Sequence, residues 1–236
     1  MLLTRLPVPR LPESAFQNAG RATWAYPLVG LILGGLAVLI WFVLLAIGLP
    51  NQVAAALTLA ALVVMTGALH EDGLADTADG FWGGRTAERR LEIMRDSRIG
   101  SYGVLALVLS QLVRFLCMSL TGPAALIVAA TVSRAVLPAM MMILPHARND
   151  GLAHSVGRPA GGAVLAALAI GLLTSIFLAH GHGLLGAVAM PAFIAWIACA
   201  KINGQTGDVL GATQQVTEIA VLLALVPGYV AVSGSA

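Results

Sequence analysis

Residues 24–49 read WAYPLVGLILGGLAVLIWFVLLAIGL and contain no Asp, Glu, Lys or Arg. A helix that crosses the hydrocarbon core of a bilayer needs about 20 predominantly apolar residues. Six further runs of this kind follow along the chain, at 52–70, 101–121, 123–145, 161–180, 183–200 and 209–232. The sequence therefore predicts an all-α fold, a polytopic transmembrane helix bundle of about seven spans that forms one integral-membrane domain over residues 1–236.

The composition agrees with a membrane protein and excludes two other classes. Of the 236 residues, 58% are apolar and only 10% are charged, whereas a soluble domain carries about 25% charged residues. So few charges cannot cover a water-facing surface, and the lipid bilayer is the expected partner. The formal net charge of +2 is too small and too dispersed to predict a nucleic-acid-binding surface.

The positions of the charges predict the orientation of the chain. Of the 13 Lys and Arg residues, 11 lie in the segments 1–22, 71–100, 146–160 and 201–208. If the seven spans simply alternate in direction, all four segments lie on the same side of the membrane. The excess of positive charge then places that side, with the N-terminus, in the cytoplasm.

One of these segments favours a short helix outside the spans. Residues 86–96 read TAERRLEIMRD, with Leu91 and Met94 on one side of a helix and Arg89 and Glu92 elsewhere. This pattern is typical of a short interfacial helix that lies on the membrane. The alternative is a solvated helix within a loop.

Three aspartates follow the second apolar run in the sequence HEDGLADTADG. Asp72, Asp76 and Asp79 are spaced i, i+4, i+7, so they point within an arc of about 60° if the run continues as one helix to Gly80. Three neighbouring carboxylates repel each other, and a divalent cation removes the repulsion. Since Mg²⁺ binds through a few carboxylates and substrate phosphates, the row predicts Asp72, Asp76 and Asp79 as metal ligands for a pyrophosphate substrate. A solvated acidic helix end is the alternative.

Two arginines near this row are candidates for binding phosphate. Arg95 and Arg98 flank Asp96 in RDSRIG, directly before a span, and a guanidinium group matches phosphate oxygens in a bidentate manner. The alternative is that Asp96 or Ser97 caps the following helix.

Two further loops on the same predicted side supply polar groups. The tetrapeptide DGLA at 72–75 recurs at 150–153, and the glycine-rich sequence KINGQTGDVLGATQQ begins at Lys201. Glycine-rich turns at helix starts commonly bind anionic groups. These loops add five candidate substrate-binding residues: Asp150, Gly204, Gln205, Thr206 and Asp208. For Asp208 an N-cap of the last span is the alternative.

Three ionisable residues fall inside predicted spans. Arg114, Arg134 and Glu218 are expensive to place in hydrocarbon, so each is expected to face a partner or a wet cavity. Both alternatives stay open: the arginines pair with Glu218, or they line the substrate cavity.

Taken together, the motifs resemble a known family of membrane enzymes. HEDGLADTADGF, RRLEIMRDSRIGSYG and GQTGDVLGA occur in this order between apolar spans, preceded by TRLPVP and YPLVG. This pattern is similar to adenosylcobinamide-GDP ribazoletransferase, the cobalamin synthase family, from Thr4 to about Leu222. Carried onto matching positions, the resemblance marks His70, Asp72, Gly73, Asp76, Asp79, Asp96, Arg98, Gly204, Thr206, Gly207, Asp208 and Glu218. Glu71 stands where the family commonly has an apolar residue, and Asn203 where a glycine is more usual.

The resemblance implies an enzyme of a bacterial cytoplasmic (inner) membrane with its active site facing the cytoplasm. The implied reaction is a Mg²⁺-dependent transfer from adenosylcobinamide-GDP to α-ribazole or its 5′-phosphate, late in vitamin B12 synthesis. It releases GMP and forms adenosylcobalamin or its 5′-phosphate. Asp79, Asp96 and His70 are the candidates for the group that takes the proton from the ribose hydroxyl. A homo-oligomer is compatible with the sequence.

Two other functions fit the sequence less well. A CDP-alcohol phosphotransferase would carry DGxxAR followed by GxxxDxxxD, and that pattern is absent from this sequence. An ion-coupled transporter would place its acids near the bilayer midplane between inverted repeats. Here nearly all acids are predicted at one surface.

Overall fold

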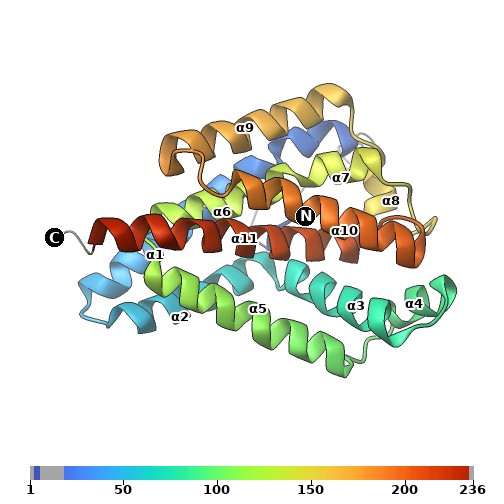
Figure 1. Cartoon of the computed structure of the whole chain (residues 1–236), viewed down its shortest axis with the longest axis horizontal. Helices are drawn as coiled ribbons and strands as arrows, with labels where there is room; N and C mark the ends of the chain where they lie inside the picture. The colour runs from blue at the N-terminus through green and yellow to red at the C-terminus, as the bar shows by residue number, and fades with distance from the viewer. Residues whose placement is uncertain (1–2, 6–18, 234–236) are drawn as a thin grey trace.

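The computed structural model describes residues 3–5 and 19–233 and is all-α over those ranges (Figure 1). Most of the TRLPVP segment lies outside them. The elements are η2 (Ala19–Ala25), α1 (Tyr26–Ala46), α2 (Asn51–Thr66), α3 (Leu69–Gly83), α4 (Ala87–Ile93), α5 (Ser101–Leu120), α6 (Ala124–Ala135), α7 (Leu137–Ile143), α8 (Leu152–Val156), α9 (Gly161–Ala179), α10 (Leu184–Ile202) and α11 (Gly207–Ser233).

The predicted polytopic membrane fold is confirmed. Within the described ranges, six helical segments are long and apolar enough to cross a membrane, and the bent pair α2–α3 makes a seventh candidate. Most of these helices leave large apolar side chains on the outside of the bundle, for example Phe177, Leu185 and Val188 at 77%, 84% and 71% exposure. Such side chains are stable in contact with lipid but not with water.

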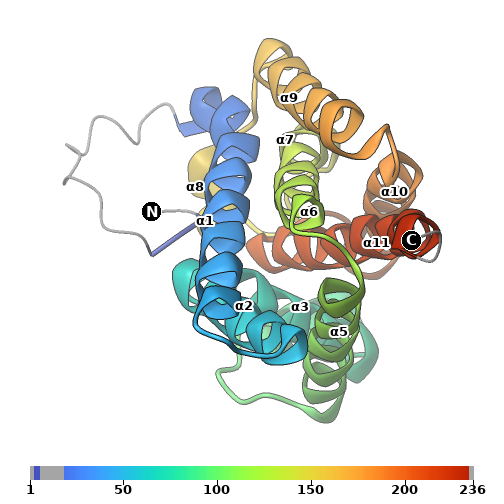
Figure 2. The same cartoon turned by 90° about the vertical axis from the view of Figure 1, so that its left-hand side faces the viewer.

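The segment α6–α7 forms the centre of the bundle. Of its most apolar window, 78% is buried, against 28% for the segments that contain α1, α5, α9 and α10. In the end-on view the other helices surround α6 and α7 (Figure 2). Side chains of α7, such as Leu137 at its start, therefore point into the interior of the protein and not towards lipid.

The second apolar run does not continue as one helix to Gly80. Helices α2 and α3 meet at an angle of 86°, because Gly67 and Ala68 both adopt left-handed backbone angles, with φ of 65° and 56°. Glycine takes this conformation readily, and its position directly after α2 is typical of a helix C-terminus. The acidic residues therefore lie on a separate short helix, α3, whose direction differs from that of α2.

Helix α3 packs closely against α11 at a glycine. A Cβ atom added to Gly73 would lie 2.8 Å from the backbone oxygen of Asp208 and 3.2 Å from the Cα atom of Gly211. Only glycine at position 73 permits this approach. The contact brings the first turn of α11 beside the acidic face of α3.

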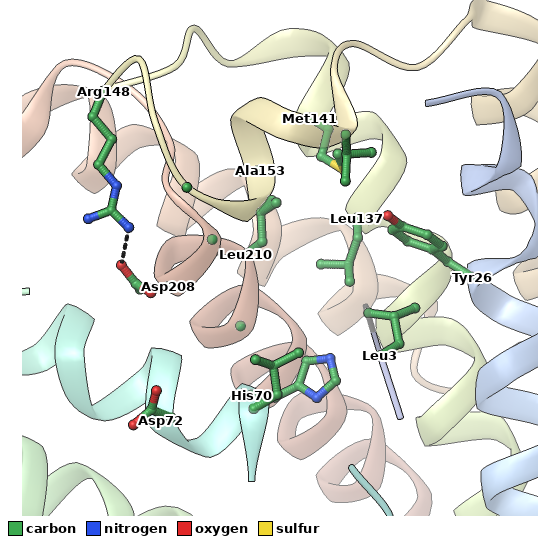
Figure 3. A pocket seen from close by; sticks show the side chains of 15 residues that line it. Leu3, Tyr26, His70, Asp72, Leu137, Met141, Arg148, Ala153, Asp208 and Leu210 are labelled. Atoms are coloured by element: carbon green, nitrogen blue, oxygen red, sulfur yellow. Dashed lines mark hydrogen bonds and ion pairs between the residues drawn. The ribbon is translucent and has the colours of Figure 1, made fainter. Parts of the chain in front are cut away.

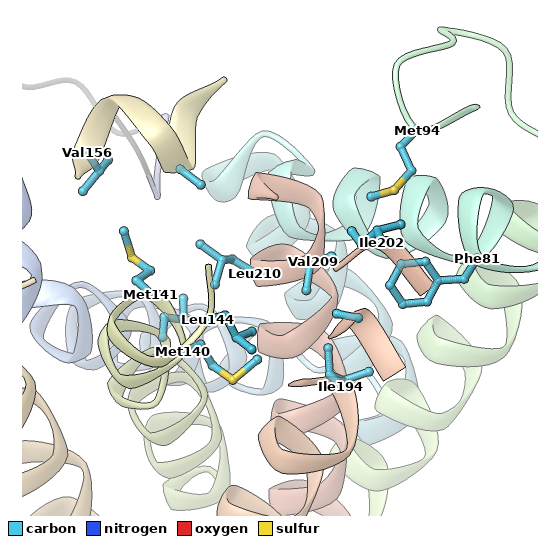
Figure 4. Packing of buried hydrophobic residues seen from close by; sticks show 13 residues of the cluster. Phe81, Met94, Met140, Met141, Leu144, Val156, Ile194, Ile202, Val209 and Leu210 are labelled. Atoms are coloured by element: carbon cyan, nitrogen blue, oxygen red, sulfur yellow. The ribbon is translucent and has the colours of Figure 1, made fainter. Parts of the chain in front are cut away.

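A cluster of buried apolar side chains anchors the far end of α3. Phe81 of α3 and Met94, directly after α4, pack with Ile194 and Ile202 of α10 and with Val209 of α11 (Figure 4). The predicted short helix at 86–96 is confirmed as α4, and it begins with the side chain of Thr86 accepting a hydrogen bond from the Arg89 backbone. Its position relative to the membrane surface stays a prediction.

Candidate active site

A cavity of about 270 Å³ opens beside the acidic face of α3 (Figure 3). Its lining comes from α1, α3, α7, α8 and α11, from the loop between α7 and α8, and from the N-terminal segment. Charged and apolar side chains lie at opposite ends of it. Asp72, Arg148 and Asp208 lie at one end, and Leu3, Tyr26, Leu137 and Met141 at the other, with His70 at the base between them. A mostly apolar pocket with a few convergent polar groups is the usual form of a small-molecule site.

The charged end gathers carboxylates from two helices. Asp72 and Asp76 lie one turn apart on α3, and Asp208 lies in the first turn of α11. The Asp76 carboxyl experiences the charges of Asp72, Asp208 and Asp79, and that of one cation, Arg148. Arg148 also bonds to Asp208, with 3.3 Å between Nη2 and Oδ2. The packing of α11 on α3 thus adds Asp208 to the acidic group.

Asp79 faces different surroundings from the other two acids of the row. Its Oδ2 accepts a hydrogen bond from the Gly100 backbone N–H at 2.7 Å, and its Oδ1 accepts one from Gly103 at 2.9 Å. It is only 7% exposed. These two donors are among the unpaired N–H groups at the start of α5. Asp79 therefore caps α5 from another helix, and the sequence alternative of a cap by Asp96 or Ser97 is wrong.

No preformed metal centre of three side chains is present in residues 3–5 and 19–233. No three His, Cys, Asp or Glu side chains are grouped closely enough to hold an ion there. A Mg²⁺ ion nevertheless needs only one or two carboxylates when substrate phosphates complete its coordination. Asp72 and Asp208 line the cavity, and Asp76 lies near enough for the charges of both, and of the cation Arg148, to act on its carboxyl group.

His70 is buried at the base of the cavity without a hydrogen-bond partner. It is 2% exposed, and neither ring nitrogen has a partner among the described residues. Buried polar groups are almost always hydrogen-bonded, and leaving one unpaired costs about 1–3 kcal/mol. Its place on the cavity wall makes a bound ligand the natural partner.

Arg114, Arg134 and Glu218 pair inside the bundle, which confirms one of the two sequence alternatives. Arg114 bonds to Glu218 at 2.8 Å and to Glu71 at 2.8 Å, and Arg134 lies 3.7 Å from Glu218. All four side chains are at most 8% exposed. Gln215 also joins the network, donating to Glu71.

This network explains the departure at position 71. Glu71 has one carboxylate oxygen bonded to Arg114, so two buried cations and two buried anions balance. Removing one partner of such a group would leave an uncompensated buried charge. Nothing in the sequence names the partner of Glu71, and the signal that it carries is an acidic residue at a commonly apolar position.

The two arginines that flank Asp96 lie away from the cavity. Arg95 pairs with Asp150 at 2.7 Å, and Arg98 pairs with Asp96 at 2.8 Å. The side chain and backbone N–H of Arg98 lower the pKa of Asp96 to about 2. None of these four residues is among those that line the cavity. Asp150 also lies 3.4 Å from Arg148 and so connects Arg95 to the site.

In the glycine-rich sequence that begins at Lys201, some residues stabilise the loop and others line the cavity. The Gln205 amide donates to the backbone oxygens of Met141 and Leu144, both at 3.1 Å. Thr206 accepts a hydrogen bond from the Val209 backbone at 3.3 Å, so Thr206 rather than Asp208 caps α11. Gln205 and Thr206 therefore hold the loop in place.

Two glycines of that loop have distinct roles. A Cβ at Gly204 would collide with the backbone oxygen of Pro145, whereas a Cβ at Gly207 would meet nothing within 4 Å. Gly204 thus permits the close approach of two loops, and Gly207 lines the cavity together with Asp208.

Comparison with known proteins identifies the family. Three adenosylcobinamide-GDP ribazoletransferases are similar over almost the full chain. The protein of Bradyrhizobium diazoefficiens is 46% identical and covers 94% of this chain and 88% of its own. That of Mesorhizobium japonicum is 42% identical with coverages of 94% and 89%, and that of Azorhizobium caulinodans is 47% identical with 93% and 90%. No solved structure matches. Because the profile described as Cobalamin-5-phosphate synthase matches residues 1–226, the chain belongs to that family.

Proposed function

We propose that this chain transfers the adenosylcobinamide phosphate moiety from adenosylcobinamide-GDP to α-ribazole or its 5′-phosphate. The products are GMP and adenosylcobalamin or its 5′-phosphate. The similarity to proteins named adenosylcobinamide-GDP ribazoletransferase supports the reaction. The observation that carries it is one cavity with carboxylates from α3 and α11 at one end and an apolar wall at the other.

A Mg²⁺ ion is proposed at the charged end of the cavity, held by Asp72 and Asp76 with Asp208 beside them. The carboxylate cluster around Asp76 fits a hard cation that prefers oxygen ligands. When bound, the ion would neutralise charge on the diphosphate and on the departing GMP. Asp208 takes the place of Asp79 in this proposal, because both oxygens of Asp79 accept backbone hydrogen bonds.

The side chains of the cavity have two further roles in this proposal. Arg148 lies on the cavity wall and binds phosphate oxygens there, since a guanidinium group suits such oxygens. One ring nitrogen of His70 accepts the proton of the ribose hydroxyl that attacks the phosphorus. Of the three candidate bases, His70 is supported by its place on the wall and its unpaired nitrogens. Asp79 and Asp96 are engaged by N–H donors elsewhere.

The cavity is proposed to face the cytoplasm of a bacterial cell at its inner membrane. Arg148 and Asp208 lie in two of the four segments that together carry most of the Lys and Arg residues. Positively charged loops remain on the cytoplasmic side, where nucleotide substrates are available.

The direct test uses the purified protein in detergent with adenosylcobinamide-GDP, α-ribazole and Mg²⁺. We expect GMP release that stops when EDTA removes Mg²⁺ and returns when the ion is restored. Asp76→Asn should lower the turnover rate by about 100-fold or more, because a metal ion supplies several kcal/mol of charge stabilisation. Glu92→Gln is the matched control, since Glu92 pairs with Arg89 on the exposed surface.

Two outcomes would contradict the proposal. A folded wild-type sample that releases no GMP rejects the reaction. Wild-type turnover and Mg²⁺ dependence in Asp76→Asn reject the metal site, even if the reaction occurs.

A further inference from the structure

The cavity has a charged end and an apolar end, and the transfer of a phosphate explains only the charged one. Its charged residues, Asp72, Arg148 and Asp208, lie on one side, while Leu137 and Met141 lie on the opposite side (Figure 3). A substrate that fills it must therefore present a phosphate at one end and an apolar group at the other.

Three bulky groups of the substrates are candidates for the apolar end: the guanine base, the corrin ring and the dimethylbenzimidazole base. A guanine base carries hydrogen-bond donors and acceptors along its edge, and burying them against Leu137 and Met141 would leave them unpaired at a cost. A corrin ring with its side chains is too large to enter a cavity of about 270 Å³. The dimethylbenzimidazole base of α-ribazole is flat, compact and edged by methyl groups. Of these three groups, this base is the one that presents a largely apolar surface to an apolar wall.

The sequence of groups in α-ribazole also agrees with the direction of the cavity. Its base is attached to the ribose, and a ribose hydroxyl attacks the phosphorus. With the benzimidazole at the apolar end, the ribose lies near the middle of the cavity. His70 lies there, between the charged and the apolar side chains (Figure 3). The reacting phosphate then lies towards Asp72 and Asp208.

We infer that the apolar end of the cavity, formed by Leu3, Tyr26, Leu137 and Met141, is the binding site for the benzimidazole base of α-ribazole. Met141 and Leu137 limit the size of the base that the enzyme incorporates. This inference rests on the proposed function, since α-ribazole is a substrate only if that reaction occurs. It assigns the nucleophile, rather than the nucleotide or the corrin ring, to the interior of the protein.

Two adjacent methionines provide a matched pair of variants. Met140 and Met141 both lie on α7 and are 5% and 2% exposed. Both belong to the same buried cluster, but only Met141 lines the cavity. Met140→Ala therefore reproduces the loss of packing in Met141→Ala without a change in the cavity wall.

The experiment measures steady-state kinetics with each substrate varied in turn. Met141→Ala is expected to raise the KM for α-ribazole by about tenfold, the effect of losing most of an apolar side-chain contact. The KM for adenosylcobinamide-GDP should stay within about twofold. Met140→Ala should leave both values within about twofold.

A second measurement uses a larger base. The riboside of naphthimidazole adds a fused ring, so the wild-type cavity should accept it poorly. Met141→Ala should raise the ratio of its kcat/KM to that of α-ribazole by about tenfold, and Met141→Leu should restore the preference of the wild type. This gain cannot result from a loss of folding.

The outcomes separate the inference from the proposed reaction. If wild-type protein releases no GMP, the reaction itself fails. If GMP is released but Met141→Ala raises the KM for adenosylcobinamide-GDP instead, the apolar end binds the other substrate and the inference is wrong. Equal effects of Met140→Ala and Met141→Ala, or an unchanged preference for the larger base, would also overturn it.

Discussion

At the scale of single residues, the three aspartates of α3 share one face of the helix but have different neighbours. Asp72, Asp76 and Asp79 point in similar directions along one helix, but their exposure falls from Asp72, which is exposed, to Asp79, which is buried. The buried carboxylate meets the start of α5 and accepts two backbone hydrogen bonds. The residue that joins the remaining acids is Asp208, from the first turn of α11, far along the chain.

This difference predicts distinct phenotypes for two isosteric substitutions. Asp79→Asn should lower the stability by about 1–2 kcal/mol, the usual effect of weakening a helix cap, and leave the Mg²⁺ concentration for half-maximal activity within about twofold. Asp76→Asn should change that concentration or abolish activity without a comparable loss of stability. Thermal unfolding in detergent and a Mg²⁺ titration of GMP release measure both quantities. A large shift of the Mg²⁺ requirement in Asp79→Asn would restore the original three-ligand prediction.

At the scale of helices, close contacts depend on glycine at particular positions. Helix α1 packs against α6 at Gly30, where an added Cβ would lie 2.7 Å from the Ala130 carbonyl carbon and 2.8 Å from Thr131 Cα. On the same helix, a Cβ at Gly35 would meet nothing within 4 Å. The sequence shows two similar glycines, and only the packing distinguishes them.

The two glycines of α1 therefore serve as an experiment and its control. Gly30→Ala should destabilise the protein by about 1–3 kcal/mol, the effect of forcing a methyl group into a packed contact. Gly35→Ala should be neutral or slightly stabilising, because alanine favours a helix over glycine. The melting temperatures of the two variants in the same detergent make the comparison. Equal melting temperatures would argue against the close contact of α1 with α6.

At the scale of the whole molecule, the connections differ between the two ends of the bundle. Helices α4 and α8 lie at one end, and the turns after α1 and α9 lie at the other (Figure 1). The end with α4 carries the charged segments that supply Arg148 and Asp208 to the cavity. The turns after α1 and α9 contain no Lys, Arg, Asp or Glu.

This asymmetry predicts which loops a membrane-impermeant reagent can reach. In a background with Cys117 and Cys199 replaced by alanine, Glu92→Cys should react with a charged maleimide in inverted inner-membrane vesicles and not in intact spheroplasts. His182→Cys should show the opposite pattern. Both positions are exposed in the structure. Reversed labelling would contradict the proposed cytoplasmic face.

The sequence alone determined the class of fold and the chemical character of the site. Long apolar runs are sufficient to predict membrane spans, because a bilayer excludes unpaired backbone groups whatever the neighbouring helices are. The charge in four segments and the acidic row at 70–80 follow directly from residue order. The three motifs also indicated the family, which the comparisons confirm.

The tertiary structure alone decided which of these residues meet. Spacing fixes the direction of a side chain around its own helix, but it does not say which helix lies in that direction. The bend at Gly67 and Ala68 turns the acidic row away from the line of α2, and the contact at Gly73 brings Asp208 beside it. Asp79 became a cap of α5 and Glu71 a partner of Arg114 for the same reason. Contacts between distant residues depend on how helices pack, and packing is a property of the folded chain as a whole.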